Sequence, residues 1–197
     1  MKKFLFALLS FIIFSSSIAA AEKVPVKIAR LPIIFQSTVP DIDTRATLET
    51  KIERAIHIPL NQTLQAAEYL PMNDSAQTLN EIWQDMSREN KKTRLRDAIR
   101  PLAEKIDADI IACPILLSYS QWEDGFSSFG ETYLYSYVQA ELIVYDRRTD
   151  DLVDKKTSRM YHDSYHPVGT ASYLAKACFD ELIDKTKLHQ LIMNVGK

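Results

Sequence analysis

Glycine is scarce in this sequence: there are four among 197 residues, at positions 125, 130, 169 and 196. Phosphate-binding loops, nucleophile elbows and dinucleotide-binding turns all need glycine where the backbone approaches a ligand closely or adopts a positive φ. No G-x-S-x-G, Walker A or G-x-G-x-x-G motif occurs in the chain. These enzyme classes are therefore largely excluded, and we predict no catalytic and no cofactor-binding residues.

Cysteine and net charge are also low. Cys113 and Cys178 are the only cysteines, too few for a disulfide framework. Each lies in an apolar pattern, where a free cysteine packs as a small hydrophobic residue. We favour two buried thiols, with a disulfide between them as the alternative. A formal net charge of −2 provides no general attraction to nucleic acid or anionic lipid.

The first residues have the pattern of a secretory leader. Two lysines precede an apolar segment, residues 4–14, which is followed by small residues up to the Ala-Ala-Ala at 19–21. That segment is well short of the roughly 20 apolar residues that span a bilayer, and no cysteine follows it for lipid attachment. We predict a signal peptide at 1–21 and a single α/β domain at 22–197. The mature protein is expected to be exported, periplasmic or extracellular, and not membrane-spanning.

Hydrophobic periodicity predicts the secondary structure of the rest. Apolar residues recur at every second position in half-buried strands and at every third or fourth in amphipathic helices. The predicted strands are 24–35, 64–70, 109–122, 133–145 and 152–165, and the predicted helices run from Asp43 or Thr44 to Pro59, from Asp74 or Ser75 to Met86, from 95 to 106 with a kink or restart at Pro101, and from 172 to 185.

The resulting order is β-α-β-α-α-β-β-β-α. It predicts an α/β (α+β) fold with a single mixed sheet, a carboxy-terminal antiparallel meander and helices packed on the sheet. Residues 110–117 are apolar at consecutive positions, as in a central strand buried beneath helices. Pro114 has no N–H for a ladder, so we expect it at a bulge or beside an edge.

Three segments together resemble a known group of proteins. They are KIARLPIIF at 27–35, LAEKIDADIIACPILLSY at 102–119 and AELIVYDRRTDDLVDKKTSRMY at 140–161. This combination is similar to a broad group of exported cell-envelope proteins that includes the curli-secretion lipoprotein type, penicillin-binding-protein activator lipoproteins and the amino-terminal domain of the Tol-system propeller protein. The resemblance implies an α/β domain that acts through protein contacts without catalysis. Asp107 stands where the group has glycine, and no functional residue is carried over.

Aromatic residues near one loop are the best candidates for an interaction site. Along the strand at 133–145, tyrosines alternate with apolar residues and so share one face. Aromatic side chains at exposed strand positions bury a large area at low entropic cost. An ordinary face packed by a helix is the alternative. The interaction candidates are Trp122, Phe126, Tyr133, Tyr135 and Tyr137.

Three further features have simple structural interpretations. Trp83 falls on the apolar stripe of its helix and is interpreted as core. His162, Asp163 and His166 form a metal site only if the strand bends, since the two imidazoles lie about 13 Å apart on an extended strand. The basic run near one helix is interpreted as a solvated face, with docking to anionic wall polymer or membrane as the alternative; it comprises Arg88, Lys91, Lys92, Arg94, Arg96 and Arg100.

The sequence therefore predicts an exported, non-catalytic cell-envelope protein that acts by protein–protein binding. No cofactor is expected, an envelope protein is the expected partner, and nucleic acid is not. The alternatives are a small periplasmic metal-dependent hydrolase that uses His162, Asp163 and His166, and a wall-glycan binding module that uses Trp122 and the tyrosines.

Overall fold

A computed structural model describes residues 24–89, 92–124 and 132–195. One mixed sheet runs through it in the strand order β3-β1-β4-β5-β6, with β2 paired to β4 beyond the end of β1. β1 pairs in parallel with β3 and β4, and β2 pairs in parallel with β4. β4, β5 and β6 form an antiparallel meander. The strands are Val26–Arg30 (β1), Ile34–Phe35 (β2), Ala67–Tyr69 (β3), Ile110–Asp124 (β4), Tyr133–Asp146 (β5) and Asp151–Ser164 (β6).

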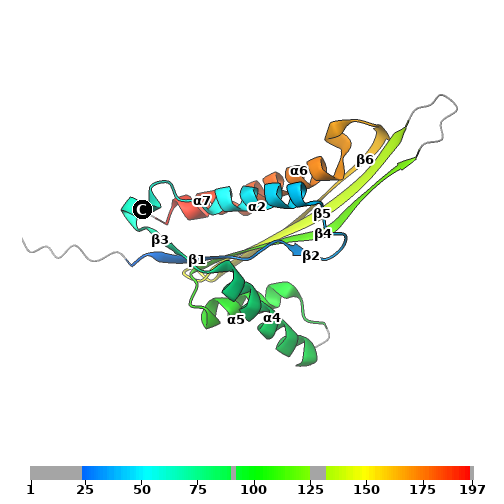
Figure 1. Ribbon diagram of the computed structural model, residues 1–197. Helices are drawn as coiled ribbons and strands as arrows, with labels where there is room; N and C mark the ends of the chain where they lie inside the picture. Colours follow the sequence, from blue (N-terminus) through cyan, green and yellow to red (C-terminus); the bar gives the residue numbers. More distant parts are fainter. Residues whose placement is uncertain (1–23, 90–91, 125–131, 196–197) are drawn as a thin grey trace, which may run out of the picture.

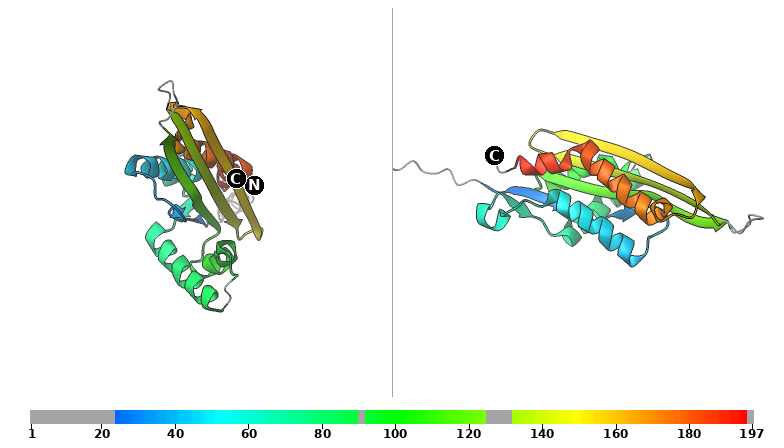
Figure 2. Two further views of the ribbon diagram at one scale, coloured as in Figure 1. Left: turned by 90° about the vertical axis from the view of Figure 1, so that its right-hand side faces the viewer. Right: turned by 90° about the horizontal axis from the view of Figure 1, so that it is seen from above.

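Helices cover both faces of this sheet (Figure 1). On one face lie α2 (Ile42–Ile56), α6 (Ala171–Thr186) and α7 (Leu188–Met193), with α2 beside α6 along the strands (Figure 2). On the other face lie α4 (Met72–Glu89) and α5 (Leu95–Lys105), which pack on each other and on β1, β4 and β5. The core accordingly falls into two apolar clusters separated by the sheet. The predicted fold class, mixed sheet and meander are confirmed.

Several details differ from the sequence prediction. The predicted strand at 64–70 is only Ala67–Tyr69, because residues Asn61–Leu64 form a helical turn, α3. Helix α5 continues through Pro101 without a restart. Helix α2 begins earlier, since Asp41 is the N-cap and its Oδ1 accepts a hydrogen bond from the Thr44 N–H at 2.8 Å. The predicted strand at 24–35 is divided into β1 and the short β2. The elements α3, α7 and the 3₁₀ turn η1 (Pro167–Gly169) were not predicted, because each is too short to show a periodic pattern.

Pro114 occupies the position expected of a proline in a central strand. The carbonyls of Ala112 and Leu116 accept hydrogen bonds from Leu31 and Gln36, so alternate residues of β4 direct their polar groups toward β1 and β2. Pro114 lies midway between them, where the pairing with β1 has ended at Ala112 and the pairing with β2 has yet to begin at Ile115. Its missing N–H therefore faces the gap between two short strands and removes no ladder bond.

The two cysteines are free and buried. Cys113 belongs to the cluster beneath α4 and α5, whereas Cys178 belongs to the cluster beneath α2 and α6. The sheet separates them, which confirms two buried thiols over a disulfide. Burial raises the pKa of both, that of Cys178 to about 11, so neither provides a reactive thiolate at neutral pH.

We expect both thiols to be unreactive in the folded protein. Iodoacetamide at pH 8 should leave Cys113 and Cys178 unmodified, because alkylation needs an accessible thiolate. The same treatment in guanidinium chloride should alkylate both, and intact-mass spectrometry counts the adducts. Rapid modification of either residue in native buffer would contradict the burial of that residue.

Among the described residues, no helix has the length and apolarity needed to cross a bilayer. The predicted leader at 1–21 lies outside the described residues, and its separation from a domain at 22–197 stays a prediction.

Candidate functional site

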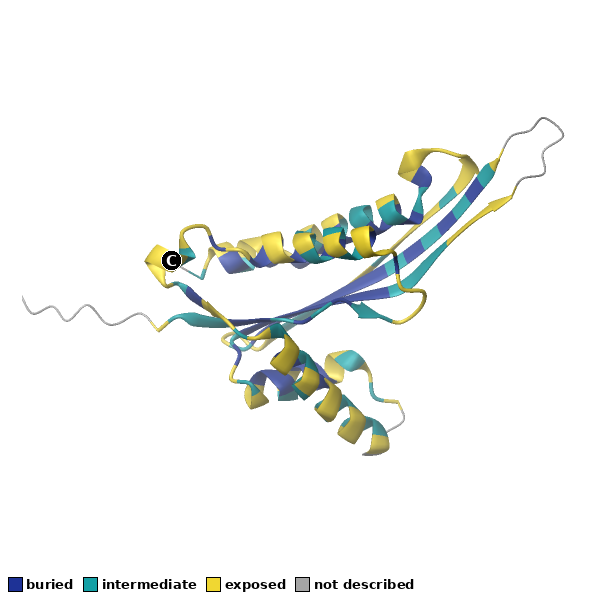
Figure 3. Cartoon of the chain, viewed as in Figure 1, coloured by how far each residue is buried: buried dark blue, intermediate teal, exposed yellow. Residues whose placement is uncertain are grey.

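The outer halves of β4, β5 and β6 are covered by helices on one face only. The strands extend well beyond α4 and α5, while η1 and the start of α6 lie over their opposite face (Figure 1). Figure 3 shows this difference as alternating buried and half-buried positions along the outer part of β5. We call the uncovered face of these strand halves the aromatic surface. Its defining residues are Trp122, Tyr133, Tyr135, Tyr137, Met160 and His162.

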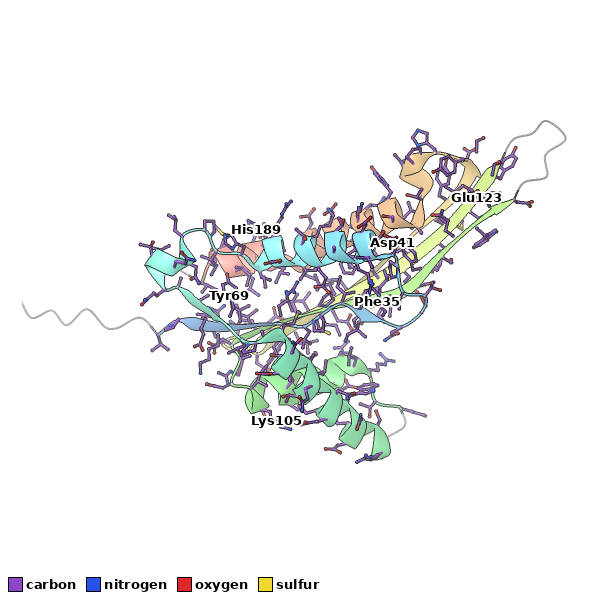
Figure 4. All side chains as sticks on the ribbon, viewed as in Figure 1. Phe35, Asp41, Tyr69, Lys105, Glu123 and His189 are labelled. Atoms are coloured by element: carbon purple, nitrogen blue, oxygen red, sulfur yellow. The ribbon has the colours of Figure 1, made fainter. Side chains whose placement is uncertain are left out.

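Strand alternation places these side chains on one face. Along β5, Leu134, Ser136 and Val138 are buried toward α6 and η1, whereas the intervening tyrosines are only half-buried. On β4, Gln121 also points toward α6, because its side-chain oxygen accepts a hydrogen bond from the Ala171 N–H at 2.8 Å. Trp122, the next residue, must then point the other way. Glu123 shares the side of Gln121 and lies near the far end of β4 (Figure 4).

Three rings form a stack across the strands. Trp122 pairs in register with Tyr135, and Tyr135 pairs with His162. The Trp122 and Tyr135 ring centroids are 5.4 Å apart with 7° between the ring planes. The Tyr135 and His162 centroids are 4.1 Å apart at 26°, and Tyr133 approaches the edge of His162 at 6.5 Å. Both faces of Tyr135 are therefore covered by neighbouring rings, and the stack presents mainly ring edges outward.

The aromatic surface carries almost no charge. By register, its remaining described positions on the three strand halves are Ser118, Ser120, Asp124, Gln139, Ser158 and Ser164. Asp124 is the one carboxylate among these positions, and none is lysine or arginine. Trp122 is 53% exposed and Met160 is 76% exposed. A face rich in tyrosine, tryptophan and methionine and depleted of lysine and glutamate has the composition of a protein-interaction site.

The structure brings together four of the five predicted interaction residues. Trp122, Tyr133, Tyr135 and Tyr137 share this face, and Phe126 lies outside the described residues. His162 was not among the predicted interaction residues. Its place in the stack depends on the register between β5 and β6, which alternation within one strand does not reveal.

The metal alternative is not supported by the geometry of its three residues. His162 and Asp163 are consecutive in β6 and therefore point to opposite faces of the sheet. The Asp163 carboxylate accepts a hydrogen bond from the Ser164 N–H at 2.7 Å, and His166 Nδ1 accepts one from the Val168 N–H at 3.3 Å. Within residues 24–89, 92–124 and 132–195, no three His, Cys, Asp or Glu side chains are close enough to hold one metal ion.

A pocket adjoins the inner end of the aromatic surface. It has a volume of about 750 Å³ and lies between α4, the start of α5 and the sheet. Gln139 of the aromatic surface is followed two positions later on the same face by Glu141, which lines the pocket. The apolar wall is formed mainly by Leu31, Ile34, Leu79, Trp83, Ile115 and Leu117.

The polar part of the pocket contains two carboxyl groups, those of Glu141 and Asp154, and three cations, Arg94, Arg96 and Lys156. Lys156 Nζ lies 3.1 Å from Glu141 Oε2, and Arg96 Nη1 lies 3.3 Å from Asp154 Oδ2. Burial and the neighbouring Asp154 raise the pKa of Glu141, while Lys156 acts against them. Asp154 Oδ1 is buried without a hydrogen-bond partner among the described residues. By alternation along β5, Glu141 shares the face of Tyr133, Tyr135 and Tyr137, and its burial follows only from the position of α4 and α5.

Trp83 is also more than a core residue. It is half-buried, packs against the apolar cluster beneath α4 and α5, and lines the pocket. Arg94 and Arg96 of the predicted solvated basic run line the same pocket. The apolar stripe of α4 predicted Trp83 on the inner side of the helix, but it gave no indication that a pocket lies beside this residue.

Comparison with known proteins gave no family assignment: no family model matches this chain, and no curated protein matches it. Similar solved structures include a hypothetical protein of Chlamydia trachomatis, CT253, with 10% identity over 85% of this chain and 98% of that chain at a TM-score of 0.47. Lipoprotein GNA1162 of Neisseria meningitidis has 14% identity over 81% and 99% at 0.37. The PelC dodecamer of Paraburkholderia phytofirmans has 13% identity over 83% and 88% at 0.39. At these scores, none of the three bears on the function of this chain.

Proposed function

We propose that this chain is an exported, non-catalytic protein of the cell envelope that binds a partner protein through the aromatic surface. Export to the periplasm or beyond rests on the leader pattern in the first 21 residues. Membership of the exported envelope group rests on the three resembling segments described above. The observation that carries the binding proposal is the Trp122–Tyr135–His162 stack on a sheet face without a covering helix.

The composition and order of this surface support a protein partner. Stacked rings on paired strands are held in place before binding, so little side-chain entropy remains to be lost when a partner docks. Tryptophan and tyrosine are enriched among residues that dominate binding energy. The near absence of charge means that a partner desolvates few ionic groups.

A wall glycan fits the same surface less well. Sugars stack on the open face of an aromatic ring, whereas both faces of Tyr135 are covered by Trp122 and His162. In this stack, only the outer faces of Trp122 and His162 remain for a sugar. Capture of a glycan in place of a protein would therefore contradict the proposal.

The test uses site-specific photo-cross-linking. A photoreactive amino acid at position 122 in the tagged protein is expected to capture one dominant protein from a native envelope fraction. The same amino acid at position 173 provides the control, because Tyr173 is 50% exposed but lies on α6, over the opposite face of the sheet. Equal capture from both positions would contradict the proposed surface, as would capture of glycan alone.

The captured protein, once purified, permits a quantitative test. Trp122→Ser and Tyr135→Ser should each weaken its binding by about 30-fold or more, the loss that defines an interface hot spot. Tyr173→Ser should leave the Kd unchanged. Circular dichroism checks that each variant is folded, and unchanged affinity in both surface variants would overturn the proposal.

A further inference from the structure

The pocket beside the aromatic surface has separate apolar and polar regions. Trp83 and Leu79 of α4 face it from the helical side, and Ile34 and Ile115 face it from the sheet. Glu141 and Asp154 belong to β5 and β6 and form the polar region together with Lys156, Arg96 and Arg94. A volume of about 750 Å³ falls within the range of small-molecule sites, which are mostly apolar with a few convergent polar groups.

The charged groups of the polar region differ in their exposure. The side chains of Glu141 and Asp154 are 9% and 13% exposed, whereas those of Lys156 and Arg96 are 55% and 43% exposed. The carboxyl groups are thus the shielded part of the polar region, whereas Lys156, Arg96 and the third cation of the lining, Arg94, are exposed.

One carboxylate oxygen of the polar region, Asp154 Oδ1, accepts no hydrogen bond from an N–H group of the described residues. Asp154 Oδ1 is fully buried and accepts no hydrogen bond from an N–H or hydroxyl group of the described residues, although Oδ2 of the same carboxylate is paired with Arg96. The neighbouring group that can share a proton with this carboxylate is the carboxyl of Glu141. Leaving a buried charged acceptor unpaired is costly. An N–H donor supplied from the pocket would satisfy this atom and would also face the neighbouring Glu141.

We propose that the pocket is a binding site for small amphipathic amines. The ligand's ammonium group donates to Asp154 Oδ1 and to the Glu141 carboxylate, and its apolar body lies between Trp83 and Ile115. Charge-assisted N–H···O bonds in a partly desolvated site provide the affinity and the selectivity for a cation. This inference does not depend on the partner-binding proposal, since it concerns different side chains and a different class of ligand.

The main alternative is that the pocket selects carboxylates over amines. A small carboxylate would pair with Lys156 and Arg96, but its charge would lie beside both buried carboxyl groups. Like charges in a partly buried site repel strongly. The three exposed cations gain little from such a ligand, because they are solvated, and Lys156 and Arg96 are also paired already.

The test compares two probes of similar size on the same protein. 2-Phenylethylamine and 3-phenylpropionate share an aromatic body and differ in the sign of the end group. The Trp122→Phe variant leaves Trp83 as the only tryptophan, because the sequence contains two. Titration at pH 7.5 is expected to give a saturable change in Trp83 fluorescence with the amine and no saturable change with the carboxylate. The inference would be overturned if the carboxylate bound as tightly as the amine or more tightly. It would also be overturned if the amine failed to saturate the fluorescence change up to about 10 mM, a concentration about ten times a Kd of 1 mM.

Substitutions then locate the ammonium group. Asp154→Asn and Glu141→Gln should each weaken amine binding by about ten-fold or more, because each removes a charged acceptor while nearly keeping its shape. Asp151→Asn is the matched control, since Asp151 begins the same strand but is exposed and lies outside this pocket. An unchanged Kd in both pocket variants would contradict the assignment even if the amine binds.

Discussion

Replacing Phe179 with alanine should lower the free energy of unfolding by about 3–5 kcal/mol, the usual cost of truncating a fully buried aromatic side chain. Phe179 has no exposed surface and is among the largest fully buried side chains of the described residues. It lies on α6 in the cluster that joins α6 and α2 to β5. The truncation leaves a cavity between helix and sheet that rigid strands on one side cannot fill. Urea denaturation followed by circular dichroism measures the change.

Tyr173→Ala provides the control for this result. It truncates an aromatic residue of the same helix, but Tyr173 is 50% exposed, so the change should stay within about 0.5 kcal/mol. A loss below about 1 kcal/mol for Phe179→Ala would mean that α6 does not pack on the sheet as described.

Gly169→Ala should destabilise the protein by about 1–3 kcal/mol, the range for overpacking a filled site. A Cβ atom at this position would overlap the ring of Tyr161 and lie 2.6 Å from its Cγ. The ring cannot easily move away, because the Tyr161 hydroxyl donates a hydrogen bond to the Ser164 carbonyl at 2.9 Å. The 3₁₀ turn η1 would then have to shift away from β6, and the thermal midpoint should fall accordingly.

A double-mutant cycle separates this clash from other effects of the methyl group. In a Tyr161→Ala background the ring is absent, so Gly169→Ala should lower the free energy of unfolding by no more than about 0.5 kcal/mol. The difference between this cost and the cost in the wild-type background is the coupling energy of the two residues. An undiminished penalty in that background would show that the backbone of η1, and not the ring, requires glycine.

Local patterns accounted for the elements of the fold. The alternation in β5 and the apolar repeats of α2, α4, α5 and α6 arise from the pleat and the helical turn, which act over a few residues. They were sufficient to predict the order of the main elements, the meander and the shared face of Tyr133, Tyr135 and Tyr137. They failed for α3 and α7, since four and six residues hold too few turns to establish a period.

The candidate site was predicted only in part, for a similar reason. A stack of Trp122, Tyr135 and His162 requires the register of three strands, and register is set by pairings across the whole meander. Glu141 lies on the same face of β5 as the tyrosines. Alternation along the strand therefore does not distinguish Glu141, which is buried, from a position on the uncovered part of that face. The pocket requires the location of α4 and the start of α5 above β5 and β6.

The sequence by itself thus determined which residues share a face of each strand or helix, because that depends on backbone geometry within one element. Only the tertiary structure decided which part of each face is covered. Helices α4 and α5 bury the inner half of one sheet face and leave its outer half without a covering helix. The same alternating pattern therefore gives core at Ile143 and a half-buried ring of the aromatic surface at Tyr135. The physical reason is that the place where a helix ends over a sheet is set by contacts between residues far apart in the chain, which no local period records.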